Sequence, residues 1–427
     1  MATNRIPGLL LKDHWFDLPV DYTNPARTLR VYAREVVAPG KETAKLPWLV
    51  YFQGGPGFGA ARPMANSGWL GRVLPDYRVL LLDQRGTGLS TPVTAQTLAH
   101  MGSARAQADY LMHFRADSIV RDAEAIRQQL VGDQPWSILG QSYGGFCAVR
   151  YLSAAPQGLK EVLITGGIPS LTRPADDVYR ATYTRVVDKN RQYYQRYPGD
   201  VQRVRQIVDA LQQSEVRLPG GGVLSPRRFL QLGLGLGMSD GFETLHYLLE
   251  EAFVTQADGR SALNWNFLQH VEHHQSFDTN PIYAVLQEAC YTQGSASGWS
   301  AHRLLGEFPS FALDAEGPLL FTGEMVYPWM LDDYAQLRPL KGAAELLAHT
   351  ADWPVLYELE RLRQNTVPVA AAVYYDDMYV HREFSEETAR EVPNVKLWHT
   401  NEYEHNGLRA DGGAVLGRLL AMVRGEV

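Results

Sequence analysis

Short apolar runs that end in turn-forming residues recur through the first 165 residues. Leu46–Phe52, Tyr77–Asp83, Trp136–Leu139 and Glu161–Thr165 are four such runs. Runs of this length between turn signals predict buried strands. Between the second and third runs, Ala116–Leu130 carries apolar residues at helical spacing and predicts an amphipathic helix. This alternation of strands and helices predicts an α/β fold with a parallel sheet covered by helices on both faces.

The pattern changes over residues 172–363, where aromatic residues are frequent and convincing strands are few. The segments that we expect to be helical there are Val178–Tyr197, Phe242–Phe253, Asn264–His274, Tyr327–Leu337 and Asp352–Leu362. We therefore predict a helical cap over 172–363, inserted between two parts of one α/β core, 1–171 and 364–427.

The α/β alternation returns after residue 364. Pro368–Tyr375 and Val395–His399 predict strands, and Ser385–Glu391 and Ala414–Val423 predict helices. The second part of the core should therefore add two strands to the sheet.

Composition narrows the functional classes. The chain has 427 residues, 45% hydrophobic and 20% charged, with a formal net charge of −7. This balance is typical of a globular protein and does not favour a nucleic acid or an anionic membrane as partner. No leader segment is evident, and no apolar run is long enough to span a membrane. The two cysteines, Cys147 and Cys290, lie far apart in sequence. We therefore expect a cytoplasmic protein without disulfides. No histidine group has metal-ligand spacing, so we expect no metal and no cofactor.

Gly140-Gln141-Ser142-Tyr143-Gly144 matches the G-x-S-x-G pattern of a nucleophilic serine on a sharp strand-to-helix turn. A second match surrounds Ser239. Ser142 follows an apolar strand and precedes a small-residue helix, whereas the residues before Ser239 are rich in glycine and make a poor strand. Asp240 and Glu243 resemble a capping box at the start of a helix. We therefore predict that Ser142 is the nucleophile and that Ser239 is structural.

A serine nucleophile needs backbone donors for the oxyanion and two partners for the proton. The expected donors are the N–H groups of Tyr143 and of Gly55, which lies in the turn Gly54-Gly55-Pro56-Gly57 after the first apolar run. In the strand–turn–helix fold of such hydrolases the acid and then the histidine follow the serine. His405, after the last predicted strand, is the expected base. The residues leave the acid open between Asp376 and Asp377.

Five segments together resemble one known family. The segments are GGPG (54–57), DQRGTGLS (83–90), GQSYGG (140–145), DDMYV (376–380) and EHNGLR (404–409). They resemble the prolyl aminopeptidases, or proline iminopeptidases, a branch of the α/β-hydrolase superfamily, of the larger bacterial type. The resemblance covers about residues 46–409 and implies the α/β-hydrolase fold with a helical cap. One departure is Gln53, where many relatives have histidine before GGPG.

The resemblance also implies an activity and further site residues. It assigns the acid to Asp377 and implies a serine aminopeptidase that releases N-terminal proline from peptides through an acyl-enzyme. A cationic N-terminus needs carboxylates, and by resemblance to cap glutamates of the family these are Glu243 and Glu324. Tyr327 and Trp329 are the expected walls of the proline pocket.

Two alternatives stay open from the sequence. The first is a related hydrolase of the same fold, such as an esterase, another amidase or a tripeptidyl-releasing peptidase, which would share the triad but not the paired cap carboxylates. The second alternative hypothesis is a non-catalytic binding protein of the same fold. The intact set of serine, acid and histidine argues against it.

Overall fold

A nine-stranded sheet carries the site. In this computed structural model, which describes residues 3–427, the strand order is β1-β2-β3-β5-β4-β6-β7-β10-β11. The strands are β1 (Thr3–Ile6), β2 (Leu9–Pro19), β3 (Thr28–Val37), β4 (Trp48–Phe52), β5 (Arg78–Asp83), β6 (Trp136–Gln141), β7 (Leu159–Thr165), β10 (Val369–Tyr374) and β11 (Val395–Thr400). The first three strands are antiparallel, and the sheet is parallel from β5 to β11.

Helices cover both faces of the parallel strands. On one face α1 (Gly68–Val73) and α17 (Gly407–Arg424) pack over alternate residues such as Leu49 and Leu81. On the other face α4 (Ala116–Val131) and α5 (Tyr143–Ala154) pack over Val50 and Leu80 in a separate core. Successive side chains of a strand point to opposite faces, so each strand contributes to both cores. This arrangement confirms the predicted α/β fold with a mostly parallel sheet.

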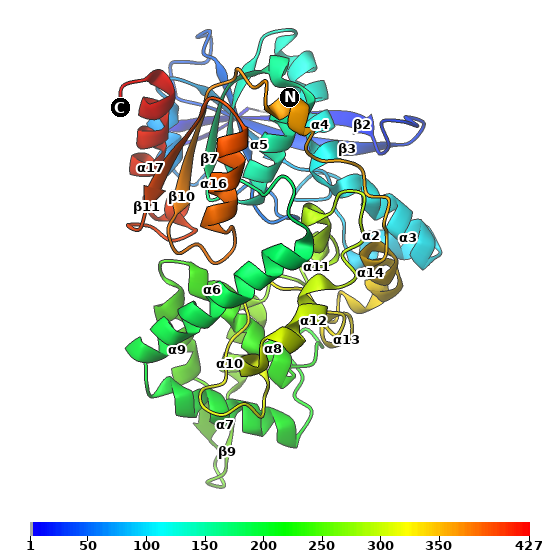
Figure 1. Cartoon of the computed structure of the whole chain (residues 1–427), viewed down its shortest axis with the longest axis vertical. Coiled ribbons are helices and arrows are strands. Elements are labelled where there is room, and N and C mark those ends of the chain that lie inside the picture. The colour runs from blue at the N-terminus through cyan, green and yellow to red at the C-terminus, as the bar shows by residue number, and fades with distance from the viewer. Residues whose placement is uncertain (1–2) are drawn as a thin grey trace.

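Most of the residues between β7 and β10 are helical and lie below the sheet in Figure 1, whereas the last of them, with the short helix Leu359–Leu362, return along α5. The longer helices are α6 (Ala175–Arg196), α7 (Asp200–Gln213), α9 (Gly241–Glu250), α10 (Trp265–His274) and α14 (Lys341–Ala348). The shorter ones are α8 (Pro226–Leu230), α11 (Pro281–Val285), α12 (Ser300–Leu304), α13 (Met330–Asp333) and α15 (Leu359–Leu362). In the core, α2 (Ala95–Leu98) and α3 (Ala104–Leu111) precede α4, and α16 (Arg382–Glu391) lies between β10 and β11. Within residues 3–427, no helix combines the length and apolar character needed to cross a bilayer.

Two predicted helices are much shorter than expected. Over Tyr327–Leu337 only α13 is helical, and over Asp352–Leu362 only α15. Pro328 and Pro354 account for the absence of helix at Tyr327 and Trp353, because a proline drives the residue before it out of the helical region. Prediction over these two segments was therefore largely wrong.

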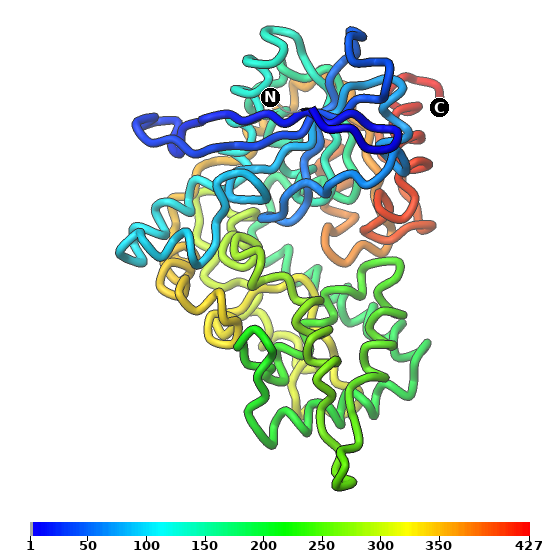
Figure 2. The backbone as a smooth tube through the Cα atoms, turned by 180° about the vertical axis from the view of Figure 1, so that it is seen from behind, coloured from blue at the N-terminus to red at the C-terminus, as the bar shows by residue number. Residues whose placement is uncertain are grey.

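Strands were missed at two places. Antiparallel β2 and β3 form a long ribbon, seen in dark blue from behind in Figure 2, although Leu9–Pro19 contains charged residues that mask its alternation. Across this ribbon the side chain of His14 on β2 hydrogen-bonds that of Glu35 on β3 at 2.7 Å. The bond satisfies both buried polar side chains. The other place is the small hairpin of β8 (Phe253–Thr255) and β9 (Ser261–Leu263), which begins where a longer α9 was expected.

Candidate active site

Ser142 lies between β6 and α5 in a strained conformation, with φ 54° and ψ −125°. A residue other than glycine seldom adopts such a positive φ, and strain of this kind gathers at functional sites. The neighbouring glycines are required by space. A Cβ at Gly144 would lie 2.0 Å from the carbonyl oxygen of Phe52, and one at Gly140 would lie 2.5 Å from that of Gly144. The turn therefore forms only with these small residues.

The structure brings Ser142, His405 and Asp377 together from three separate loops. His405 Nε2 is 2.9 Å from Ser142 Oγ, and His405 Nδ1 is 2.8 Å from Asp377 Oδ2. Both partners of the serine are nearly fully buried, with 4% of His405 and 3% of Asp377 exposed. The order along the chain is serine, acid, histidine, as this fold requires. The contacts suit general-base activation of the hydroxyl.

The structure also separates the two aspartates that the residues alone left open. Asp377 Oδ1 accepts hydrogen bonds from the backbone N–H of Tyr379 at 2.8 Å and of Val380 at 3.0 Å. These bonds aim its other oxygen at the histidine. Asp376 points away and accepts a hydrogen bond from Arg185 at 2.9 Å. Only Asp377 therefore contacts His405.

Burial and charge act in opposite directions on His405. Burial lowers the pKa of the imidazole, but the carboxylate of Asp377 raises it by its charge and its hydrogen bond. The charges of Glu324 and Glu404 raise it further. The net pKa lies above the ordinary value of 6.5. An imidazolium that forms as the serine loses its proton is therefore stabilised at this position.

Backbone donors lie beside the serine hydroxyl. Gly55 and Tyr143 both line the cavity next to Ser142. Within residues 3–427, neither backbone N–H donates a hydrogen bond to the backbone in the turns, loops and caps. Tyr143 is also the first residue of α5, where the helix dipole favours negative charge. The side-chain amide of Gln84 donates to the carbonyl of Gln53 at 3.0 Å and helps hold the glycine turn.

The DQRGTGLS segment packs against the same turn. Asp83 Oδ1 accepts a hydrogen bond from the N–H of Ala60 at 2.9 Å, and its Oδ2 accepts one from Leu89 at 2.8 Å. The guanidinium of Arg85 is buried and binds Asp122 through Nε at 2.7 Å. These bonds fix the loops on the side of the sheet where Ser142 lies.

Glu324 reaches the Ser142 cavity from the inserted helical region. Its Oε1 accepts a hydrogen bond from the hydroxyl of Tyr283 at 2.6 Å. Desolvation by burial raises the pKa of Glu324 to about 7, even though the bond from Tyr283 and the charge of His405 lower it. Burial removes water that would stabilise the charged carboxylate. A cation that binds beside it restores much of that stabilisation.

The structure does not bring Glu243 into this group. Its carboxylate accepts hydrogen bonds from Arg196 at 2.7 Å and from the Tyr197 hydroxyl at 3.1 Å, and its side chain is 39% exposed. The expectation that Glu243 binds substrate beside Glu324 therefore has no support in the geometry. An arginine on the neighbouring α6 neutralises this carboxylate instead.

The two expected pocket aromatics also lie elsewhere. Tyr327 is buried and shares a hydrogen bond with the hydroxyl of Tyr183 at 3.0 Å. Trp329 stacks on Tyr327 at a centroid distance of 5.4 Å, and neither side chain lines the Ser142 cavity. Both rings serve as packing in the inserted region.

Other side chains that the sequence did not single out line the cavity. They are Phe146, Gln287, Cys290, Tyr291 and Val380. Phe146 on α5 lies four residues after Ser142, and residues at this spacing share a helix face. Helical spacing could therefore have predicted that Phe146 lies near Ser142. Residues 287–291 come from the inserted region, and no local pattern marks them as neighbours of Ser142.

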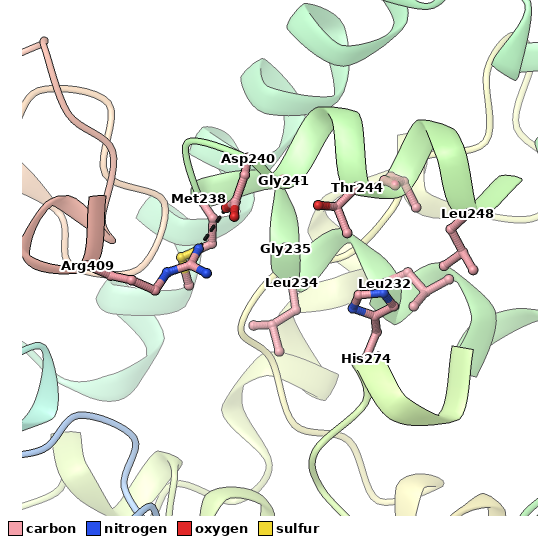
Figure 3. Close-up of a pocket in the computed structure, with 11 residues that line it drawn as sticks. Leu232, Leu234, Gly235, Met238, Asp240, Gly241, Thr244, Leu248, His274 and Arg409 are labelled. Carbon is pink, nitrogen blue, oxygen red and sulfur yellow. Dashed lines mark hydrogen bonds and ion pairs between the residues drawn. The ribbon is translucent and has the colours of Figure 1, made fainter. Parts of the chain in front are cut away.

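The second G-x-S-x-G segment lies beside a different cavity, of about 320 Å³, shown in Figure 3. Ser239 exchanges hydrogen bonds with the side chain of Asn406, at 3.0 and 3.1 Å. The predicted capping box is absent, because Asp240 occupies the N-cap of α9 without a side-chain cap bond and pairs with Arg409 at 2.7 Å. Ser239 therefore packs against the loop that carries His405, and among the described residues its side chain bonds Asn406 and not a histidine.

Comparison with known proteins identifies the family of the chain. Residues 47–219 match the family model described as the alpha/beta hydrolase fold. The chain is 50% identical to a proline iminopeptidase of Aeromonas sobria over 98% of both chains. It is 38% identical to a proline iminopeptidase of Aspergillus aculeatus over 97% of this chain and 94% of that one. Among solved structures, an esterase from Exiguobacterium antarcticum matches with 14% identity and a TM-score of 0.42, covering 93% of this chain and 96% of that one. The chain belongs to the proline iminopeptidase family within the α/β hydrolases.

Proposed function

We propose that the protein is a serine aminopeptidase that releases proline from the N-terminus of peptides. The observation that carries the proposal is a partly buried carboxylate, Glu324, in the cavity lined by Ser142, whose hydroxyl is 2.9 Å from His405. A hydrolase that acts only on neutral esters has no use for a carboxylate there, because a buried charge without a cation is costly. The full-length match to two proline iminopeptidases supports the same substrate class.

In the proposed reaction, the Ser142 hydroxyl attacks the carbonyl carbon of the prolyl residue while His405 Nε2 takes its proton. The N–H groups of Tyr143 and Gly55 stabilise the oxyanion. His405 then gives the proton to the leaving amine, and a prolyl ester on Ser142 remains. A water molecule, activated by the same histidine, hydrolyses this ester. Asp377 holds the imidazole in the tautomer with its proton on Nδ1.

Glu324 is the proposed acceptor of the substrate ammonium. A protonated prolyl nitrogen has two N–H donors, and a charge-assisted hydrogen bond to a carboxylate is about twice as strong as a neutral one. Phe146 and Tyr291 are the proposed apolar walls around the pyrrolidine ring, in place of Tyr327 and Trp329. The walls supply apolar contact, and Glu324 supplies selection for a free amine.

We also propose that residues 172–363 form a cap on a core made of 1–171 and 364–427. The proposal is supported by the large sheet, whose strands stop at Thr165 and resume at Val369. A cytoplasmic location is proposed from the two cysteines, both free and buried.

The proposal is tested with arylamides of proline, alanine, leucine and N-acetylproline. The protein should cleave the free prolyl arylamide best and the acetylated one hardly at all. Faster cleavage of alanyl or leucyl arylamides, or equal cleavage of the acetylated substrate, would favour a different amidase. A fluorophosphonate probe should label wild type at Ser142 in parallel, which separates a wrong substrate class from an inactive preparation.

A further inference from the structure

One face of helix α6 contacts both loops that supply the acid and the base. Arg185 Nη1 donates to Asp376 Oδ1 at 2.9 Å, and Lys189 Nζ donates to Glu404 Oε1 at 2.6 Å. The two acceptors are the residues directly before the acid and the base of the triad. The two donors are four residues apart, so they project from the same face of the helix. A single cap helix therefore holds both loops, and it does so at the residues next to the acid and the base.

The adjacent face of α6, formed by Val186 and Asn190, holds the segment that carries Glu324. Asn190 Nδ2 donates to the carbonyl of Phe321 at 2.8 Å, and the N–H of Phe321 donates back to Asn190 Oδ1 at 2.8 Å. Val186 packs so closely on Gly323 that a Cβ there would lie 2.6 Å from Val186 Cγ2. Figure 1 shows α6 running between the sheet and the helices below it. The helix thus contacts the amine-binding segment and the triad loops at once.

Burial distinguishes the Lys189–Glu404 pair from ordinary surface pairs on this helix. The side chains of Lys189 and Glu404 are 1% and 31% exposed, whereas those of Arg191 and Asp188 are 62% and 37% exposed, so the two pairs differ mainly in the burial of the cation. A buried ammonium is costly without its carboxylate, so loss of either partner should displace the loop. An exposed pair contributes little and serves as a matched comparison on the same helix.

We propose that these two adjacent faces of α6 set the position of the Glu324 segment relative to the Ser142–His405 pair, and that Lys189 is the main positioning residue. The inference rests on the proposed role of Glu324 as the amine acceptor. Arg185 has the same role for the acid loop. Neither side chain touches substrate in this account, and both act through the residues next to the triad.

The test compares Glu404→Gln, Lys189→Met and Lys189→Arg, with Arg191→Met as the control. Glu404→Gln and Lys189→Met should each lower kcat on a prolyl arylamide about tenfold or more, because small displacements of a general base are costly. Lys189→Arg should recover most of the loss, and Arg191→Met should stay within about twofold of wild type. The double variant Glu404→Gln/Lys189→Met should lose no more than the worse single variant, because both remove one contact.

The pH profile separates positioning from a merely structural effect. His405 faces the carboxylates of Asp377, Glu324 and Glu404, and Lys189 lies behind the last of these. Glu404→Gln removes one negative charge, so the pKa of His405 should fall and the acidic side of the kcat/KM profile should move to lower pH. A general loss of stability would lower the amount of active protein without moving this profile.

Labelling by a fluorophosphonate probe distinguishes the proposed function from the proposed role of α6. The probe reacts with the serine of the triad and does not need recognition of a substrate amine. If wild type is labelled but does not cleave prolyl substrates, the proposed function fails, and the labelling rates of the variants still test the role of α6. Thermal melting identifies a variant that fails to fold. If Lys189→Met fails to fold, the inference is judged on the isosteric variant Glu404→Gln. Wild-type kcat with an unmoved profile in Glu404→Gln, additive losses in the double variant, or an equal loss in Arg191→Met would overturn the inference.

Discussion

At the scale of single residues, the site depends on how carboxylates are aimed. Asp377 and Asp376 are neighbours in sequence, yet two backbone N–H groups turn the first toward His405 while Arg185 holds the second away. Sequence spacing predicted the serine and the histidine but left the aspartates equivalent, because the turn that distinguishes them is a three-dimensional feature. The resemblance to a family supplied that choice.

Asp377→Asn should reduce kcat by about three to four orders of magnitude, because the amide no longer stabilises the imidazolium or its tautomer. The pKa of His405 is raised in the wild type, so activity should be lost as the pH falls through a value above 6.5. Removing the carboxylate charge lowers this pKa, so the residual activity should persist to lower pH. Profiles of kcat/KM against pH measure both effects, and an unmoved acidic side would contradict the assignment.

Glu324→Gln should lower kcat/KM for a prolyl arylamide by about 10- to 100-fold, the usual effect of losing a charged hydrogen bond. Hydrolysis of an ester without an amine should change by only about threefold or less, since the Ser142–His405 pair stays in place. In wild type, whose Glu324 pKa is raised to about 7, prolyl activity should also decline below neutral pH as this carboxylate is protonated.

The matched variant for this prediction is Tyr283→Phe, which removes the hydroxyl donor and leaves the carboxylate. The pKa of Glu324 should then rise further, so prolyl activity should fall near neutral pH and recover at higher pH. Equal losses on ester and prolyl substrates in Glu324→Gln would show that the residue is structural.

At the scale of elements, the strand–serine–helix turn is where the sequence was most informative. The glycines of G-x-S-x-G have a local geometric cause, so the pattern fixes both the turn and its neighbours. The helices predicted over residues 172–363 are different. Two of them are much shorter than expected, and the aromatics expected in the pocket, Tyr327 and Trp329, pack elsewhere because burial in a helical region is not specific to a binding site.

Gly144→Ala should destabilise the protein by about 1–3 kcal/mol or prevent assembly of the turn, because the added methyl group meets a backbone carbonyl that cannot move freely. Gly413→Ala on α17 is the matched control. Its Cβ would lie 3.9 Å from the nearest atoms, and alanine favours the helix by up to about 1 kcal/mol. Denaturant unfolding of the two variants gives the comparison, and similar stabilities would refute the packing argument.

At the scale of the whole molecule, the side chains around the candidate site come from regions far apart in sequence. Ser142, His405 and Asp377 lie on loops of the sheet, whereas Glu324 and Tyr291 come from the inserted residues. The cavity beside Ser142 is only about 10 Å³, so a prolyl residue requires some displacement of the surrounding side chains or helices. Long-range assembly of this kind leaves no mark in local periodicity, which is why the core was predictable and the pocket was not.

An inhibitor with a pyrrolidine ring and an aldehyde should therefore order both regions when Ser142 adds to its carbonyl. Hydrogen exchange should slow in α6 and in residues 321–324 as well as in the histidine loop, since the ligand bridges them. At about 100 times its Kd, the inhibitor should also stabilise the fold by about 2.7 kcal/mol. The effect should vanish in Ser142→Ala, and protection confined to the sheet would argue against a role for the inserted region.

The most direct measurement follows free proline released from one peptide with a free N-terminal proline and from its N-acetylated twin, using wild type and Ser142→Ala. Wild type should release proline from the free peptide alone, and Ser142→Ala should be slower by about three or more orders of magnitude with an unchanged fold. Release of acetylproline at a comparable rate, or substantial release of proline by Ser142→Ala, would contradict a serine aminopeptidase at this site.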